Sequence, residues 1–280
     1  MDAVFARIFM TLLGPSYLAL ALACQNSAPG ESNPTNAAAE RLKFMKDAVA
    51  SYELTLGEER ASGLKLQDKP VFRMGKQYAE DLADGAIFLW TGADGRPQVA
   101  VQNFLIKHAR EKQGTWVHEF TSLAPSSITA VRNGRTWWAP KTPGLELKPV
   151  PGAAKPAESA AQRARQMRLL AADFRASDDF GGRGWTELRL LPTPIARYGE
   201  SGTNLLDGEL FAFVLGTDPE VFLFLEARSG KQGLEWQYAL APMTIFAVKA
   251  SYQAKAVWEL PNRGPAVDPS KPFYVAVYVP

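Results

Sequence analysis

The feature that most constrains the fold is an internal repeat with a spacing of about 120 residues. Five segment pairs match in the same order along the chain: RLKFMKDAVASY (from Arg41) and RARQMRLLAADF (from Arg163), LKLQDKPVFRM (from Leu64) and LRLLPTPIARY (from Leu188), Asp84-Gly85 and Asp207-Gly208, LAPSSITAVR and LAPMTIFAVK, and Trp137 and Trp258. The matches include specific Pro, Arg, Asp-Gly and Trp positions. They therefore indicate a tandem duplication and not merely two similar hydrophobic patterns.

Each copy reads as one helix followed by short strands. Apolar residues at i, i+3, i+7 and i+10 predict an amphipathic helix with one buried face. These residues are Leu42, Met45, Val49 and Tyr52 in the first copy and Ala164, Met167, Ala171 and Phe174 in the second. Asn133-Gly134 and similar steps predict tight hairpins, and short connections of this kind join antiparallel strands. The predicted fold is α+β, a helix packed on an antiparallel β-meander, used twice.

We expect the two modules to form an intramolecular pseudo-dimer. The run Val221–Leu225 is apolar on both faces, so both faces must be covered, one by its own helix and the other by the first module. The counterpart run has Gln98 and Gln102 framing its valines. The predicted organisation is a signal peptide (1–23), a flexible linker (24–36), the first module (37–140), a Pro/Gly-rich linker (141–158), the second module (159–260) and a Pro-rich tail with a terminal strand (261–280).

The composition excludes several functional classes. The 31 Lys and Arg residues nearly balance the 29 Asp and Glu residues, so we expect no nucleic-acid partner. One Cys and two His cannot supply a structural zinc site or an iron–sulfur cluster, and we expect neither a metal nor a cofactor. The sequence has no G-x-S-x-G, HExxH, Walker or G-x-G-x-x-G motif that would mark a common catalytic or nucleotide-binding site.

The N-terminus reads as a bacterial export signal. A nearly uncharged run from Ile8 to Cys24 follows Arg7 and precedes a polar, Pro/Gly-rich stretch, which is the order of a signal peptide. The residues before Cys24 fit cleavage at an A-x-A site, and they also fit a lipoprotein box in which Cys24 is lipidated. An uncleaved anchor is a third reading, although the run is short for a membrane span of ~20 residues. We expect an exported protein of the periplasm or cell envelope, which contacts a membrane only through this end.

Arg73 and Arg197 recur in the two modules, as do Asp84 and Asp207. The pattern predicts one Arg–Asp pair per module. A guanidinium can hold a carboxylate or phosphate ligand through two parallel hydrogen bonds, which makes both arginines candidate ligand-binding residues. The alternative, which we favour, is a structural Arg that ties the loop before an Asp-Gly turn.

Trp138, His118 and Glu119 complete the candidate ligand-binding residues. Trp137 and Trp138 are neighbours on a predicted strand, so we expect them to point to opposite faces and only one of them to reach the core. The other could offer a stacking platform, for example for a sugar ring, although core packing is the commoner role. His118 and Glu119 are neighbours on a strand and would point apart. Glu226, near a sheet end, is expected to be solvated.

Part of the chain resembles a known family. The segments RQMRLLAADF, LRLLPTPIARY, DGELFAFVLGTDPEVFLFLEAR, WTGADGRP and HEFTSL carry the resemblance. Across roughly residues 60 to 260 the chain is similar to an uncharacterised planctomycete-type family of bacterial proteins. The resemblance implies a true folded domain, and it carries over no catalytic residues because that family has no assigned activity.

Two functional hypotheses follow. The favoured one is a non-enzymatic envelope protein that binds a small ligand or an envelope protein in a groove between its modules, because no catalytic constellation is evident. We expect Trp138, and Arg73 or Arg197, in that groove. The alternative is a hydrolase of an envelope or extracellular substrate that uses His118 or two carboxylates, such as Glu119 and a second acid. It would be recognised by His118 or two acids converging in a deep pocket.

Overall fold

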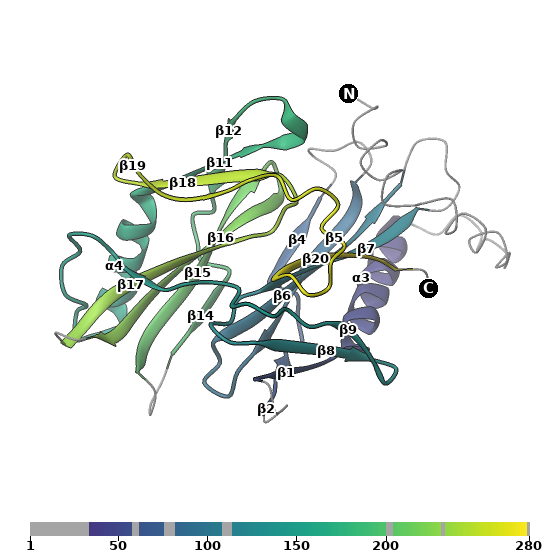
Figure 1. Cartoon of the computed structure of the whole chain (residues 1–280), viewed down its shortest axis with the longest axis horizontal. Helices are drawn as coiled ribbons and strands as arrows, with labels where there is room; N and C mark the ends of the chain where they lie inside the picture. Colours follow the sequence, from purple (N-terminus) through teal and green to yellow (C-terminus); the bar gives the residue numbers. More distant parts are fainter. Residues whose placement is uncertain are drawn as a thin grey trace, which may run out of the picture.

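The computed structural model describes residues 34–57, 62–75, 82–107, 114–199, 204–230 and 233–278. These residues form two α-helices, α3 (Pro34–Ala50) and α4 (Ala160–Ala172), and four antiparallel sheets (Figure 1). The predicted α+β architecture with antiparallel pairing is therefore confirmed. Neither described helix is long and apolar enough to cross a membrane. The predicted signal peptide and Cys24 lie outside the described residues.

The first half of the chain (residues 34–140) builds an outer sheet of order β2-β1-β8-β9. Its central sheet has the order β20-β7-β6-β5-β3, with β4 also paired to β5. The strand bounds are β1 (Glu53–Leu56), β2 (Ser62–Gly63), β3 (Lys65–Leu66), β4 (Phe72–Met74), β5 (Leu82–Thr91), β6 (Pro97–Ile106), β7 (Thr115–Ser122), β8 (Ile128–Arg132), β9 (Arg135–Trp138) and β20 (Phe273–Tyr278).

The second half (residues 159–260) has the same strand order. Its outer sheet is β12-β11-β18-β19, and its central sheet is β10-β17-β16-β15-β13, with β14 also paired to β15. The bounds are β10 (Lys148–Pro149), β11 (Phe174–Asp179), β12 (Thr186–Glu187), β13 (Arg189–Leu190), β14 (Ala196–Tyr198), β15 (Leu205–Leu215), β16 (Asp218–Gly230), β17 (Gly233–Pro242), β18 (Ala247–Tyr252) and β19 (Lys255–Leu260), with a short 3₁₀ turn at Phe180–Gly182.

Each half receives one edge strand from a segment that lies outside that half. The strand β10, from the linker after the first half, pairs with β17 of the second half. The strand β20, at the C-terminal end, pairs with β7 of the first half over Phe273–Tyr278. Figure 1 shows this yellow strand lying among the blue strands of the first half. The segment that follows each half is therefore hydrogen-bonded to the central sheet of the other half.

The strand register corrects part of the sequence alignment. Trp138 pairs with Ala130 on β8, and Trp258 pairs with Ala250 on β18. The counterpart of Trp258 is therefore Trp138 and not Trp137. In both hairpins the register shifts beside this pair, which is the signature of a β-bulge, where one extra residue sits on one strand.

The same bulge explains why both tryptophans reach one core. Trp138 is 0% exposed, and the partly buried Trp137 packs against the same hydrophobic cluster. The expectation that neighbouring strand residues point to opposite faces is wrong here, because a bulge places two residues opposite one and interrupts the alternation. Trp138 is thus not a solvent-side stacking platform.

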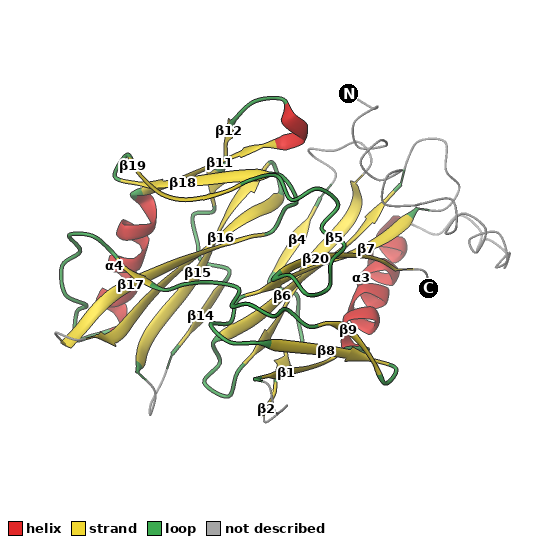
Figure 2. Ribbon diagram, viewed as in Figure 1, coloured by secondary structure: helices red, strands yellow, loops and turns green. Residues whose placement is uncertain are grey.

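Three of the four apolar clusters among the described residues hold the layers together. One lies between the outer sheet, the central sheet and α3 of the first half, and a second occupies the same place around α4 in the second half. The third joins the two central sheets, and it includes Ile87 and Leu89 from the first half with Phe222 and Phe224 from the second. The helices lie at opposite ends of the long axis, with the strands between them (Figure 2).

Alternation along the central strands produces this arrangement. On β16, Val221, Leu223 and Leu225 contact the core of their own half, whereas Phe222 and Phe224 face the other half. Strand β6 is also buried along nearly its whole length, including Gln98 and Gln102. Each central sheet is therefore covered on both faces, as an apolar run on both sides of a strand requires.

A buried ion pair crosses between the halves. Arg96, in the β5–β6 turn, donates from Nε to Glu226 Oε1 on β16 at 2.7 Å, with side-chain exposures of 5% and 0%. Tyr198 and Arg228 also donate to the Glu226 carboxylate, at 2.9 and 2.7 Å. Glu226 is therefore not solvated as the sequence suggested. It is a fixed charge on which three donors from both halves converge.

We expect Arg96→Met to destabilise the protein by about 3 kcal/mol, because it leaves the buried Glu226 carboxylate without its partner from the first half. Urea unfolding followed by circular dichroism gives the free energy. The matched control is Lys43→Met, which removes an exposed ion pair to Asp47 at 2.6 Å and should cost less than about 1 kcal/mol. Equal losses in the two variants would show that the buried pair has no special role.

Candidate functional site

The candidate arginines Arg73 and Arg197 form their predicted pairs. Arg73 binds Asp84 through two hydrogen bonds, Nε to Oδ1 at 2.8 Å and Nη2 to Oδ2 at 2.7 Å. Arg197 binds Asp207 in the same way, at 3.3 and 2.9 Å. The fork that would hold a ligand carboxylate is therefore occupied by an aspartate of the protein itself.

Each aspartate also binds a second arginine, which comes from the helix. Arg41 of α3 donates to Asp84 at 2.7 Å, and Arg163 of α4 donates to Asp207 at 2.9 Å. The strand arginines donate in addition to carbonyls near the helix N-termini, Ala38 for Arg73 and Ala160 for Arg197. Two equivalent Arg–Asp–Arg clusters thus fix each helix to its central sheet, which is the structural role we favoured.

The recurring Asp-Gly step is not a turn. Asp84-Gly85 and Asp207-Gly208 lie inside β5 and β15, directly after a register shift. A Cβ on Gly85 would overlap the Met74 side chain, and one on Gly208 would lie 2.6 Å from the Tyr198 ring. Glycine is required because the β4 and β14 side chains pack over these two positions.

His118 is buried within the first half. Its exposure is 0%, and its ring nitrogens lie 3.0 Å from Tyr52 Oη and 2.7 Å from Asn103 Nδ2. The Asn103 amide and the Tyr52 hydroxyl thus occupy the two ring nitrogens. Burial, reinforced by the positive charge of Arg132, lowers the pKa of His118 to about 3. His118 is thus neutral and structural in this setting.

Glu119 belongs to a cluster of carboxyls between the halves, hereafter the carboxyl cluster. Its members are Glu119 on β7, Asp178 on β11, and Asp218 and Glu220 at the start of β16. Asp178 and Glu220 are buried, at 0% and 3% exposure, and Glu119 and Asp218 are half-buried. Gln102 of the first half donates from Nε2 to Asp218 Oδ1 at 2.8 Å.

Burial keeps these carboxyls in their neutral form over much of the pH scale. It raises the pKa of Asp218 to about 7 and that of Asp178 to about 6. Burial, together with the neighbouring Asp218 charge, raises the pKa of Glu119 and of Glu220 well above the usual range. Within the described residues, no three His, Cys, Asp or Glu side chains are arranged to hold a metal ion.

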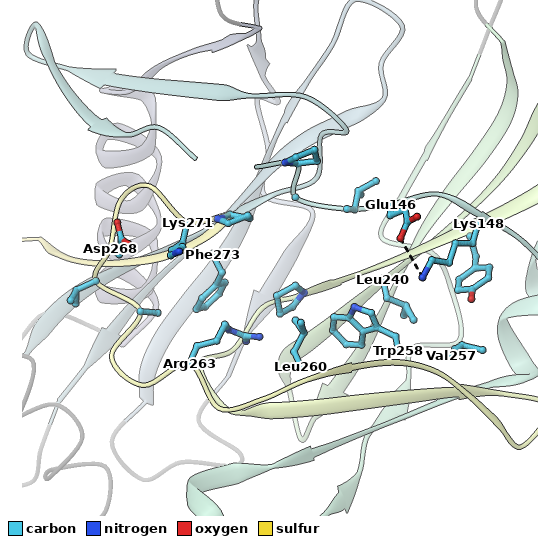
Figure 3. Close-up of a pocket in the computed structure, with 18 of the residues that line it drawn as sticks. Glu146, Lys148, Leu240, Val257, Trp258, Leu260, Arg263, Asp268, Lys271 and Phe273 are labelled. Atoms are coloured by element: carbon cyan, nitrogen blue, oxygen red, sulfur yellow. Dashed lines mark ion pairs between the residues drawn. The ribbon is translucent and has the colours of Figure 1, made fainter. Parts of the chain in front are cut away.

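A groove of about 730 Å³ lies beside this cluster, between the two halves. Its walls come from the linker after the first half, from β17 and β19 of the second half, and from the C-terminal segment. They are mainly apolar and include Leu240, Trp258, Leu260 and Phe273 (Figure 3). The volume is within the usual range of ~300 to 1,000 Å³ for small-molecule sites.

Arg263 stands between the groove and the carboxyl cluster. Its guanidinium lies 5.0 Å from the centre of the Phe273 ring and donates from Nη2 to the Thr244 carbonyl. The buried Nε and Nη1 atoms have no hydrogen-bond partner. Burial lowers the pKa of Arg263 to about 10, although Glu119 and Glu220 oppose that effect. Arg263 therefore stays charged at neutral pH, while its two unpartnered donors are buried inside the protein.

The groove contains none of the five predicted binding residues. Arg73 lines a separate shallow depression with Arg41 and Asp84, and Arg197, Trp138, His118 and Glu119 do not line the groove. Sequence reasoning missed Arg263 because it follows the second repeat, within a Pro-rich stretch without periodicity. Trp258 carried a signal, because it recurs in the repeat, and the structure packs it against the core of the second half at the edge of the groove.

Comparisons with family models, curated proteins and solved structures find no match for this chain. The resemblance to a planctomycete-type family stays a prediction. The site must therefore be interpreted from its own geometry.

We expect Asp218→Asn to stabilise the protein at pH 8 by about 1 to 3 kcal/mol and to leave it nearly unchanged at pH 4. The folded protein keeps a proton on Asp218 up to pH about 7, whereas the unfolded chain loses it near pH 4. The wild type therefore loses stability as the pH rises from about 4 to about 7. Urea unfolding at pH 4 and 8 measures the effect, and asparagine can still accept from Gln102.

The matched control for this prediction is Asp268→Asn. Hydrogen bonds from Ser270 lower the pKa of that exposed carboxyl, so its removal should not stabilise the protein at pH 8. A gain at pH 8 in both variants would contradict the carboxyl-cluster explanation.

His118→Phe should reduce the loss of unfolding free energy that the wild type shows as the pH falls below about 6.5. In the wild type, the unfolded chain takes up a proton on His118 below pH about 6.5 and the folded protein does not, so stability falls by up to ~1.4 kcal/mol per pH unit below that value. Phe does not titrate but loses the two hydrogen bonds, so the variant should be weaker at pH 7. Chemical unfolding at pH 7 and 4.5 tests this, and unchanged acid sensitivity would contradict the assignment.

Proposed function

We propose that this protein is an exported cell-envelope binding protein whose ligand occupies the groove between its two halves. The observation that carries the proposal is a groove of about 730 Å³ with mainly apolar walls and the charged Arg263 in its lining. A ligand with an apolar body and an acidic group would suit both features, because the walls favour apolar contact and the charge attracts an anion at short range.

The charge around Arg263 supports an acceptor on the ligand. Glu119 and Glu220 are its nearest acidic neighbours, and their raised pKa values favour the neutral acids. The positive charge of Arg263 is then only weakly compensated by the protein. Of the acids that line the groove, Glu146 pairs with Lys148 at 3.3 Å, and Asp268 accepts from Ser270. An incoming acceptor therefore competes with no carboxylate at Arg263 inside the groove.

We further propose that the molecule arose by tandem duplication and works as an intramolecular pseudo-dimer. The identical strand order of the halves, the equivalent Arg–Asp–Arg clusters and the paired bulges at Trp138 and Trp258 support this origin. The Trp138 ring is fully covered, whereas the Trp258 ring is partly open. The groove lies beside this open ring. Binding would therefore belong to the second copy and the segments that flank it.

The carboxyl cluster is the feature that most resembles a hydrolase site, because several acids lie close together in it. A hydrolytic pair must reach the substrate with both carboxyls. None of the four cluster members lines the groove, and Asp178 and Glu220 are almost fully buried. The geometry thus supports binding better than hydrolysis.

The proposal predicts one saturable site for anilinonaphthalene sulfonate, an aromatic anion that matches the apolar walls and Arg263. Fluorescence titration should give one site per chain. Leu260→Asp, which places a charge in the wall, should weaken binding at least ~tenfold, which corresponds to about 1.4 kcal/mol. Arg263→Gln should weaken it by a smaller factor.

The matched control is Leu169→Asp on α4, where the leucine is 62% exposed and outside the groove. It should bind the dye as the wild type does, and circular dichroism checks the fold of each variant. Binding without saturation, or equal binding by the Leu260→Asp variant and the wild type, would reject the groove as a ligand site.

A further inference from the structure

The equivalent tryptophans Trp138 and Trp258 have different surroundings. Both lie one residue beyond a β-bulge and pair with an alanine of the preceding strand. Trp138 is 0% exposed, whereas Trp258 is half-buried and lines the groove. A segment of the chain therefore covers the Trp138 ring, and no equivalent segment among the described residues covers the Trp258 ring.

The cover over Trp138 is a proline-containing turn from the C-terminal segment, with the sequence Pro269-Ser270-Lys271-Pro272. The Trp138 indole N–H donates to the carbonyl of Lys271 at 2.8 Å. Beyond β9, the amides of Ala139 and Lys141 donate to the carbonyls of Pro269 and Ser270, at 2.9 and 3.0 Å. The turn is thus held through its carbonyl oxygens.

Trp258 offers the same donor with no acceptor. The structure gives its indole N–H no acceptor among the described residues. The strand that carries it, β19, is the edge of its sheet and pairs only with β18. The covering turn follows the second half, and linker residues 143–146 hold the equivalent place after the first half. These linker residues line the groove and do not cover the Trp258 ring.

We propose that the groove binds a Pro-x-x-Pro peptide of a partner protein, held against Trp258 as the chain's own Pro269–Pro272 turn is held against Trp138. This inference rests on the proposed function and specifies its ligand. A peptide presents a carbonyl oxygen to the Trp258 indole N–H, as Lys271 does to Trp138. Proline rings pack well on aromatic side chains and lose little conformational freedom on binding.

The remaining walls fit such an occupant. Leu260 and Leu240 provide apolar contact beside Trp258 (Figure 3). A segment rich in proline brings carbonyl acceptors with few amide N–H donors, because proline has no amide N–H. A purely aliphatic ligand would leave the Trp258 indole N–H without an acceptor.

An array of immobilised octapeptides tests the inference. Each peptide carries Pro-x-x-Pro with the other positions varied, and the Asp-Pro-Ser-Lys-Pro sequence of the chain itself is included. We expect the fluorescently labelled full chain to retain a subset of these peptides. For the best of them, fluorescence anisotropy should show a Kd at least tenfold weaker for Trp258→Ala and several-fold weaker for Trp258→Phe, which keeps a ring but lacks the N–H.

The matched control is Trp185→Ala, where the ring is 44% exposed and lies outside the groove. It should bind the peptide as the wild type does. The inference is overturned if no peptide is retained, or if Trp258→Ala and the wild type bind equally. Anilinonaphthalene sulfonate separates the two claims: a dye that binds in the groove while every peptide fails leaves a ligand site that is not a peptide site, and failure of both rejects the proposed function too.

Discussion

The structure depends on the contact between the two central sheets. Aromatic and aliphatic side chains from both halves form one apolar cluster there, and the buried Arg96–Glu226 pair lies at the same contact. The apolar surface supplies the favourable free energy, since a buried ion pair contributes little net stability and costs much when broken. The pair instead fixes how the sheets are aligned, because only one alignment satisfies its donors and acceptors. The groove and the carboxyl cluster both exist because of this alignment.

The carboxyl cluster and the groove are two outcomes of joining similar halves that are not identical. Where both halves supply apolar residues the contact is dry. Polar residues of the first half, such as Gln102, meet Asp218 of the second, and burial favours the protonated form of such acids. Where the linker and the C-terminal segment diverge, one tryptophan is covered and the other is open. Sequence differences between the halves thus account for both the polar region and the candidate binding site.

Local features of this molecule were predictable from sequence and non-local ones were not. The repeat predicted the Arg73–Asp84 and Arg197–Asp207 pairs, which the structure contains. The bulge at Trp137 was not predicted, because the alternation of polar and apolar residues along a strand does not reveal one inserted residue. Arg263 escaped for another reason: its role depends on Thr244, Phe273 and the carboxyl cluster, which come from distant parts of the chain. No short window of sequence contains that information.

The exchange of edge strands has a consequence for the order of folding. The first half obtains β20 from residues 273–278, so its central sheet cannot be completed until the last part of the chain has been synthesised. The second half, in contrast, obtains β10 from a segment that precedes it. A chain that emerges N-terminus first can therefore finish its C-terminal half before its N-terminal half. The leading half therefore keeps an open β7 edge until residues 273–278 have arrived.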